Sequence, residues 1–106
     1  MRIILTTVTL AGLAAAAGWA ADAKAGQAVY DRSCRSCHGA DGAPNPAIAK
    51  AMNVQMLDLK SSEVQSKSDA DLKKAVTDGQ GKMRPIPSVT GAALDNVTAY
   101  IRSLKK

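Results

Sequence analysis

The stretch Cys34-Arg35-Ser36-Cys37-His38 decides the fold and the chemistry expected of this chain. It has the pattern C-x-x-C-H, and it holds both cysteines and the single histidine of the 106 residues. Two thiols three positions apart can add to two adjacent vinyl groups of a haem, and the histidine that follows can then ligate the iron. The pattern predicts one covalently bound haem c, attached through Cys34 and Cys37 and ligated by His38.

Other uses of this stretch fit the sequence less well. A thiol-exchange site usually accompanies a βαβ unit, and the chain has no such pattern. A zinc site needs about four ligands, whereas this chain offers two cysteines and one histidine besides scattered acids. A disulfide between cysteines three apart closes a very small loop and stabilises little.

A six-coordinate iron needs a second axial ligand, and the single histidine excludes a pair of histidines. Methionine is the usual alternative. Met83 lies in a loop rich in Gly and Pro, residues 79–87, where it can return over the opposite haem face. We therefore predict Met83 as the second iron ligand. Met52 and Met56 remain alternatives, although apolar packing is the commoner role of methionine at helical spacing.

The N-terminus has the features of an export signal. A basic start is followed by an apolar stretch, residues 3–17, and then by small residues that allow cleavage after Ala20 or after Ala23. An uncleaved membrane anchor is the alternative, but the stretch is shorter than the about 20 apolar residues that a spanning helix needs. We predict a signal peptide over residues 1–20, a single haem-binding domain over 21–106, and a periplasmic location.

The rest of the chain indicates an all-α fold of three to five short helices joined by loops. Two Gly and two Pro lie within residues 39–46, and this composition predicts a turn after the histidine. Ser68 and Thr90 are candidate N-caps, and Gly79 is a candidate helix stop. The expected helical stretches are residues 22–33, a weaker patch at 47–59, 68–79 and 90–104.

Aromatic side chains are scarce. There is no Phe, and the one Trp lies in the predicted signal, which leaves Tyr30 and Tyr100. Aromatic residues usually contribute much of the buried area of a core. We therefore expect the haem to complete the core and the haem-free chain to be largely unfolded.

The formal net charge is +5. Arg35, Lys82 and Arg84 flank the two haem-related motifs and can form a basic rim. Such a rim favours redox partner proteins with acidic docking surfaces. We expect the chain to be soluble after signal removal and to dock on membrane complexes among these partners. We expect no nucleic acid as partner, and a monomeric chain.

Together these residues resemble the class I cytochromes c, small bacterial monohaem electron carriers, over the whole chain after the signal. The resemblance rests on the C-x-x-C-H motif, on Met83 late in the chain, and on Gly26 and Tyr30 facing Val97 and Tyr100 in the first and last helices. It implies the cytochrome c fold, with those helices crossing where Gly26 lets Tyr100 approach. It also implies electron transfer rather than catalysis. The alternative is a haem-based sensor or peroxidase-like protein with an open or displaceable sixth ligand.

The resemblance further implies that a proline carbonyl accepts a hydrogen bond from the haem-ligating imidazole. Pro46 matches this role better than Pro44. Two features depart from the family pattern: Arg84 separates Met83 from Pro85, and no tryptophan is available for a haem propionate. The remaining candidates for the propionates are Arg84, Lys60, Gln80 and a backbone group.

Overall fold

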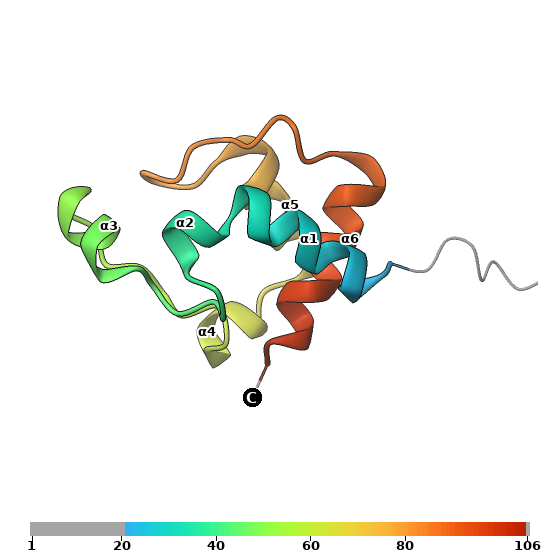
Figure 1. Cartoon of the computed structure of the whole chain (residues 1–106), viewed down its shortest axis with the longest axis horizontal. Coiled ribbons are helices and arrows are strands. Elements are labelled where there is room, and N and C mark those ends of the chain that lie inside the picture. The colour runs from blue at the N-terminus through green and yellow to red at the C-terminus, as the bar shows by residue number, and fades with distance from the viewer. Residues whose placement is uncertain (1–20, 106) are drawn as a thin grey trace, which may run out of the picture.

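The computed structural model describes residues 21–105, and this part of the chain is helical, with no strand. The all-α prediction is confirmed, and the chain path is drawn in Figure 1. The described part has six helices rather than three to five, because two single turns were not expected from the sequence. The helices are α1 Ala23–Ser33, α2 Arg35–His38, α3 Pro46–Ala51, α4 Ser62–Gln65, α5 Asp69–Asp78 and α6 Gly91–Ser103.

The first and last helices cross closely, as predicted (Figure 1). Gly26 lies at the crossing, where a Cβ atom would stand 1.9 Å from the backbone oxygen of Asn96 and 2.9 Å from the nitrogen of Val97. The glycine therefore admits the backbone of α6. The expectation that it admits the ring of Tyr100 is corrected, because this ring packs on Tyr30 with centroids 5.1 Å apart.

Side-chain caps fix the starts of two main helices. Asp22 accepts hydrogen bonds from the backbone nitrogens of residues 24 and 25 at the start of α1. Ser68 caps α5 through its hydroxyl, which accepts from Asp71 N at 3.1 Å. Gly79 ends α5 with φ +77°, as predicted. Thr90 occupies the N-cap position of α6, but its side chain makes no capping hydrogen bond.

The helical patch expected over residues 47–59 is largely wrong. α3 ends at Ala51, and Asn53 then adopts φ +51°, a left-handed conformation that stops a helix and that Asn tolerates. Residues 54–58 continue without helix. Met52 and Met56 therefore do not share one helix face. Their spacing of four residues predicted a helix that this segment does not form.

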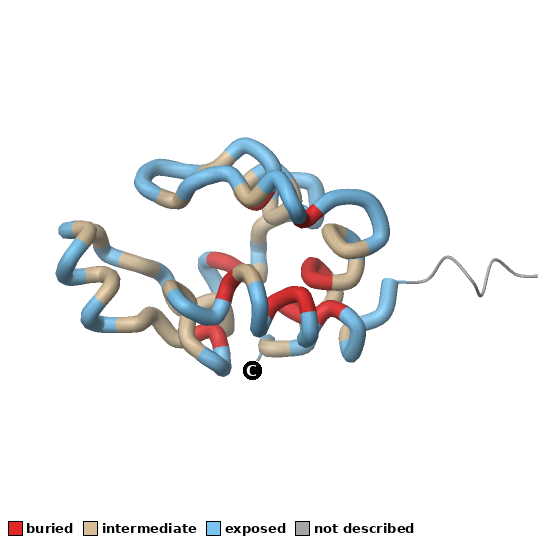
Figure 2. Tube along the Cα trace, turned by 45° about the horizontal axis from the view of Figure 1, so that its top comes forward, coloured by how far each residue is buried: buried red, intermediate tan, exposed pale blue. Residues whose placement is uncertain are grey.

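The buried residues gather where α1 and α6 meet, whereas the α3 region is half-buried or exposed (Figure 2). Tyr30 and Val97 are the largest fully buried side chains. Five of the nine buried apolar residues also line one large cavity, so the core opens directly onto it: Tyr30, Cys34, Val64, Val76 and Ile101. Within residues 21–105 no helix is long and apolar enough to cross a membrane.

Candidate haem site

A cavity of about 800 Å³ opens beside the buried core. It is lined by α1, α2, α4, α5 and α6, by the segment that follows α3, and by the loop 79–87, drawn in orange in Figure 1. Its volume lies in the range of cavities that hold cofactors and drug-sized ligands. Most of its lining side chains are apolar, and no Asp or Glu of residues 21–105 lines it.

The short helix α2 brings the predicted attachment residues to this cavity. Cys34, Cys37 and His38 all line it. The turn is closed by backbone hydrogen bonds from Cys37 and His38 to the carbonyl of Cys34, at 3.2 and 3.0 Å. Both cysteines carry free thiols. Burial raises the pKa of Cys34 to about 11, whereas the nucleophilic cysteine of a thiol-exchange site needs a lowered pKa.

His38 has the properties of a metal-binding imidazole. Burial lowers its pKa below the ordinary value, so the ring is neutral at neutral pH, and neutral imidazole is the form that binds metals. Its Nδ1 atom is buried without a hydrogen-bond partner among the described residues. The bond to the carbonyl of Pro46 is therefore not formed here, and neither Pro46 nor Pro44 lines the cavity. The role of Pro46 stays a prediction of the family resemblance.

All three candidate methionines, Met52, Met56 and Met83, line the cavity. Met52 lies in the turn that ends α3, where its nitrogen donates to the Ile48 carbonyl at 2.9 Å. The Met83 backbone instead exchanges two hydrogen bonds with Gln80, at 3.0 and 2.9 Å. Gly79 makes this turn possible, because a Cβ there would stand 2.6 Å from the Met83 carbonyl oxygen. The loop is also tied down at Lys82, whose ammonium donates to the Met52 carbonyl at 2.6 Å. Met83 is thus held at one place on the cavity wall.

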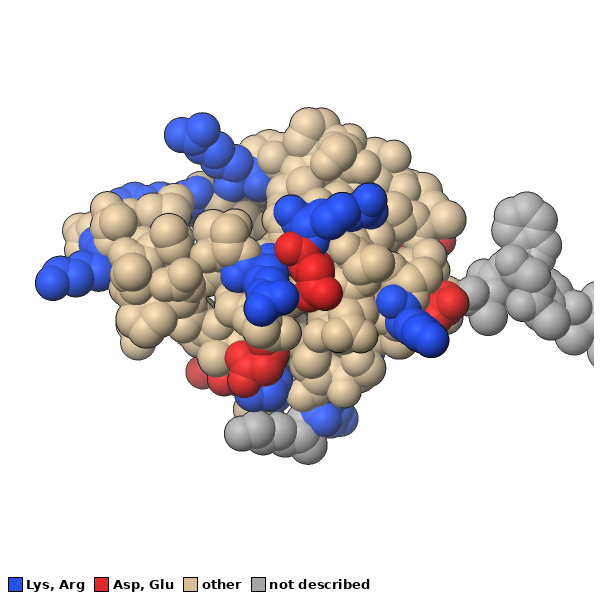
Figure 3. Space-filling model, viewed as in Figure 1, with Lys and Arg blue, Asp and Glu red and all other residues tan. Residues whose placement is uncertain are grey.

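Three basic side chains of the described residues line the cavity. Lys82 and Arg84 line it, as the predicted rim requires, and so does Lys67, which the sequence reading missed because it lies far from both motifs. Arg35 is exposed on α2 but does not line the cavity. Figure 3 shows basic side chains on several parts of one face, with acidic ones between some of them.

Of the three side chains considered as partners for the haem propionates, two line the cavity and one does not. Arg84 and Gln80 line the cavity. Lys60 does not line it. Its ammonium pairs with Asp58 at 3.1 Å and Asp41 at 3.5 Å, and it donates to the Asp41 carbonyl. Lys60 therefore joins two surface loops instead of facing the cavity.

The residues present fit a haem c. Two free thiols and a neutral imidazole with a buried, unpartnered nitrogen stand at one wall of an apolar cavity, and three thioethers line the same cavity. This donor set matches the His/Met ligation of c-type cytochromes. Fold and site together define a small c-type cytochrome.

Comparisons with known proteins agree. Residues 21–101 match the family model described as cytochrome c oxidase, cbb3-type, subunit III. Cytochrome c-554(547) of Halothiobacillus neapolitanus is 35% identical over 91 residues, which cover 81% of this chain and 100% of that protein. Among solved structures, the KustC0563 c-type cytochrome is similar in fold, with a TM-score of 0.64 at 23% identity over 76% of this chain and 98% of that one.

The chain therefore belongs to this cytochrome c family. Membership implies covalently bound haem c and a haem-based electron-transfer function.

Proposed function

We propose that this protein is a periplasmic electron carrier that binds one haem c through Cys34 and Cys37, with His38 and Met83 as the iron ligands. The observation that carries the proposal is that a single apolar cavity gathers all four residues. Met83 is favoured because, of the three methionines, it alone exchanges a reciprocal pair of backbone hydrogen bonds with one residue, Gln80.

When bound, the haem supplies an iron that accepts and releases one electron. The side chains of the protein set the conditions for this. Val64, Val76 and Ile101 are buried at the cavity wall and keep water out. An apolar wall and an uncharged thioether favour the less charged, reduced state. Within the described part of the chain, no acidic side chain lines the cavity to oppose this preference.

We propose that residues 1–20 are a signal peptide and that cleavage follows Ala20. Residues 1–20 lie outside the described part of the chain, but Asp22 supports this choice over cleavage after Ala23. The side chain of Asp22 caps α1, and its backbone nitrogen donates to the side chain of Asn96 at 2.9 Å. Cleavage after Ala23 would remove both contacts and with them a capping contribution of about 1 kcal/mol.

We further propose that the protein works as a monomer and docks on redox partners through basic side chains around the cavity. Lys82 and Arg84 are exposed and line the cavity, and Lys67 lies beside it half-buried. Positive charge near the site of electron transfer attracts acidic surfaces and speeds encounter. Nothing in this arrangement calls for a nucleic acid.

The function is tested on the protein isolated from the periplasm of an expressing bacterium. We expect a mass equal to residues 21–106 plus one haem, no thiol that can be alkylated, and the red absorption band of ferric iron bound by methionine. We also expect little binding of carbon monoxide by the reduced protein. Rapid binding of carbon monoxide without the methionine band would contradict the proposal and favour the sensor or peroxidase-like alternative.

A further inference from the structure

Tyr30 contacts the haem-binding segment through its hydroxyl group. The side chain is fully buried on α1 and lines the cavity. Its Oη donates to the carbonyl of Gly39 at 2.6 Å and lies 3.3 Å from the carbonyl of His38. The hydroxyl therefore reaches the backbone of the predicted iron ligand and of the residue directly after it.

These two carbonyls lie at the end of a helix that cannot satisfy them itself. α2 has four residues, and the last carbonyls of a helix have no partners within it. Gly39 leaves the helix with φ +71°, and a Cβ there would stand 2.4 Å from the Ala43 oxygen, so the turn is tightly folded. Within the turn the Gly39 carbonyl accepts only a long hydrogen bond, from Gly42 N at 3.5 Å. Tyr30 supplies the shorter bond from outside the turn.

The hydroxyl also joins this turn to the closely packed crossing of α1 and α6. α1 is held against α6 by the close approach at Gly26 and by the contact of the Tyr30 and Tyr100 rings. Groups that hydrogen-bond around a metal ligand fix its orientation and tune the metal. A ring at position 30 would fill the core with or without the oxygen, so packing alone does not require the hydroxyl.

We propose that the Tyr30 hydroxyl is a positioning group for the axial histidine. It fixes the carbonyls of His38 and Gly39 to the α1–α6 crossing and thereby sets where the His38 imidazole stands in the cavity. The inference rests on the proposed function, because it takes His38 as an iron ligand.

The test compares Tyr30→Phe with Tyr100→Phe in the haem-bound protein. Each substitution removes one oxygen from the same pair of packed rings. We expect Tyr30→Phe to keep its haem, to shift the reduction potential, and to speed amide hydrogen exchange at His38 and Gly39 roughly tenfold, the effect of losing one hydrogen bond. These amides donate to the carbonyls of Cys34 and Arg35 within the turn. Tyr100→Phe should leave the potential and both exchange rates unchanged.

Wild-type exchange rates and potential in Tyr30→Phe, or equal changes in both variants, would overturn the proposal. If Tyr30→Phe does not fold, nuclear magnetic resonance of the wild-type protein decides instead. A slowly exchanging Tyr30 hydroxyl proton close to Gly39 supports the bond, and rapid exchange with water refutes it. Wild-type spectra without histidine ligation would overturn the proposed function itself. With histidine ligation present and the variant unaffected, only the positioning role fails.

Discussion

At the scale of single residues, the assignment of the second iron ligand depends on how each methionine is held. Met52, Met56 and Met83 all reach the cavity, so proximity alone does not separate them. Met83 lies in the turn closed by Gln80, whereas Met56 lies in a stretch without regular structure. A ligand whose backbone is fixed loses less conformational freedom when it binds the iron, because much of that freedom is already lost.

We predict that Met83→Ala abolishes the methionine-to-iron absorption band and lowers the reduction potential, because a thioether ligand raises it. The haem should remain attached, since Cys34 and Cys37 are unchanged. Met52→Leu and Met56→Leu serve as matched controls, because they remove the sulfur atom and keep a similar volume. Absorption spectra and redox titration measure all three. Loss of the band in Met56→Leu, with its retention in Met83→Ala, would move the ligand to Met56.

At the scale of helices, the crossing of α1 and α6 depends on one glycine. The added Cβ of an alanine at position 26 would meet the backbone of α6, and backbone atoms cannot move aside as a flexible side chain can. The helices would have to separate, and the Tyr30–Tyr100 contact beside the crossing would loosen with them.

We predict that Gly26→Ala lowers the free energy of unfolding of the haem-bound protein by about 2–3 kcal/mol, the range of an overpacked contact. Gly91→Ala is the control, since Gly91 has φ +56° and no atom within 4 Å of its Cβ position. The control should lose only the about 1 kcal/mol of a left-handed alanine. Denaturant titration of both variants checks this, and equal losses would contradict the close approach.

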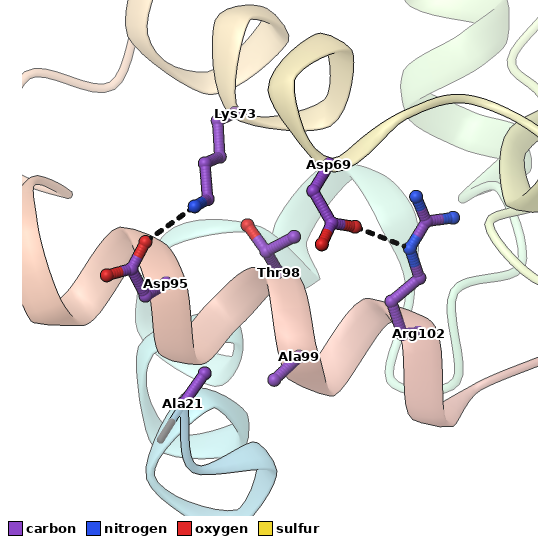
Figure 4. A pocket seen from close by; sticks show the side chains of 7 residues that line it. All are labelled: Ala21, Asp69, Lys73, Asp95, Thr98, Ala99 and Arg102. Atoms are coloured by element: carbon purple, nitrogen blue, oxygen red, sulfur yellow. Dashed lines mark hydrogen bonds and ion pairs between the residues drawn. The ribbon is translucent and has the colours of Figure 1, made fainter. Parts of the chain in front are cut away.

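The segment between α4 and α5 is fastened to α6 by Arg102. Its guanidinium donates to the carbonyl of Gln65 at 2.8 Å, to the carbonyl of Lys67, and to the carboxylate of Asp69 at 2.9 Å. Figure 4 shows the pair with Asp69 beside a second ion pair, Lys73–Asp95 at 2.7 Å. Since Lys67 lines the cavity, this fastening also fixes part of the cavity wall.

We predict that Arg102→Met destabilises the haem-bound protein by about 2 kcal/mol, because charge-assisted hydrogen bonds to backbone carbonyls are lost. Lys73→Met breaks an exposed ion pair instead and should destabilise the protein much less. Thermal unfolding of the two variants measures the difference. A larger loss in Lys73→Met than in Arg102→Met would show that the fastening at residues 65–69 is unimportant.

At the scale of the whole molecule, the cavity is a large opening in a small core. The cavity has a volume of about 800 Å³. Five of the nine buried apolar residues of the described part line it. Apolar side chains left in contact with water forgo the stabilisation of burial, roughly 25 cal/mol per Å². Without haem, these walls would be wet or collapsed, and the stability of a small domain would not cover that loss.

We therefore predict that Cys34→Ala/Cys37→Ala protein, which cannot attach haem, is largely unfolded. Far-ultraviolet circular dichroism should show little of the helix content of the haem-bound protein. Cys34→Ser/Cys37→Ser is a second variant that keeps a similar volume and a polar group. Native helix content in either variant would mean that the protein core alone supports the fold.

The charge around the cavity leads to a prediction about association. The rate of electron transfer to an acidic redox protein should fall as ionic strength rises, because salt screens the attraction. Arg84→Gln should weaken this dependence, whereas Lys24→Gln, on the first turn of α1 away from the cavity lining, should not. Stopped-flow kinetics over a series of salt concentrations measure both. A rate independent of salt would contradict docking through the basic side chains.

The sequence by itself determined the chemistry and the local structure. The C-x-x-C-H spacing predicts the attachment residues, since both thiols and the imidazole lie within five positions. The bounds of α1 and α5 follow from Asp22, Ser68 and Gly79, because capping acts over one turn of helix. The class I cytochrome resemblance gave the family, which the comparisons bear out.

The tertiary structure decided what depends on residues far apart in the chain. At Gly26 the close neighbour is the backbone of Asn96 rather than the ring of Tyr100. All three methionines line one cavity, and Lys60 pairs with acidic side chains. The tertiary structure also revealed the bond from Tyr30 to Gly39 and the fastening at Arg102. Periodicity and spacing report which neighbours share a turn. They do not report which carbonyl a distant hydroxyl or guanidinium meets, because that depends on how the helices pack.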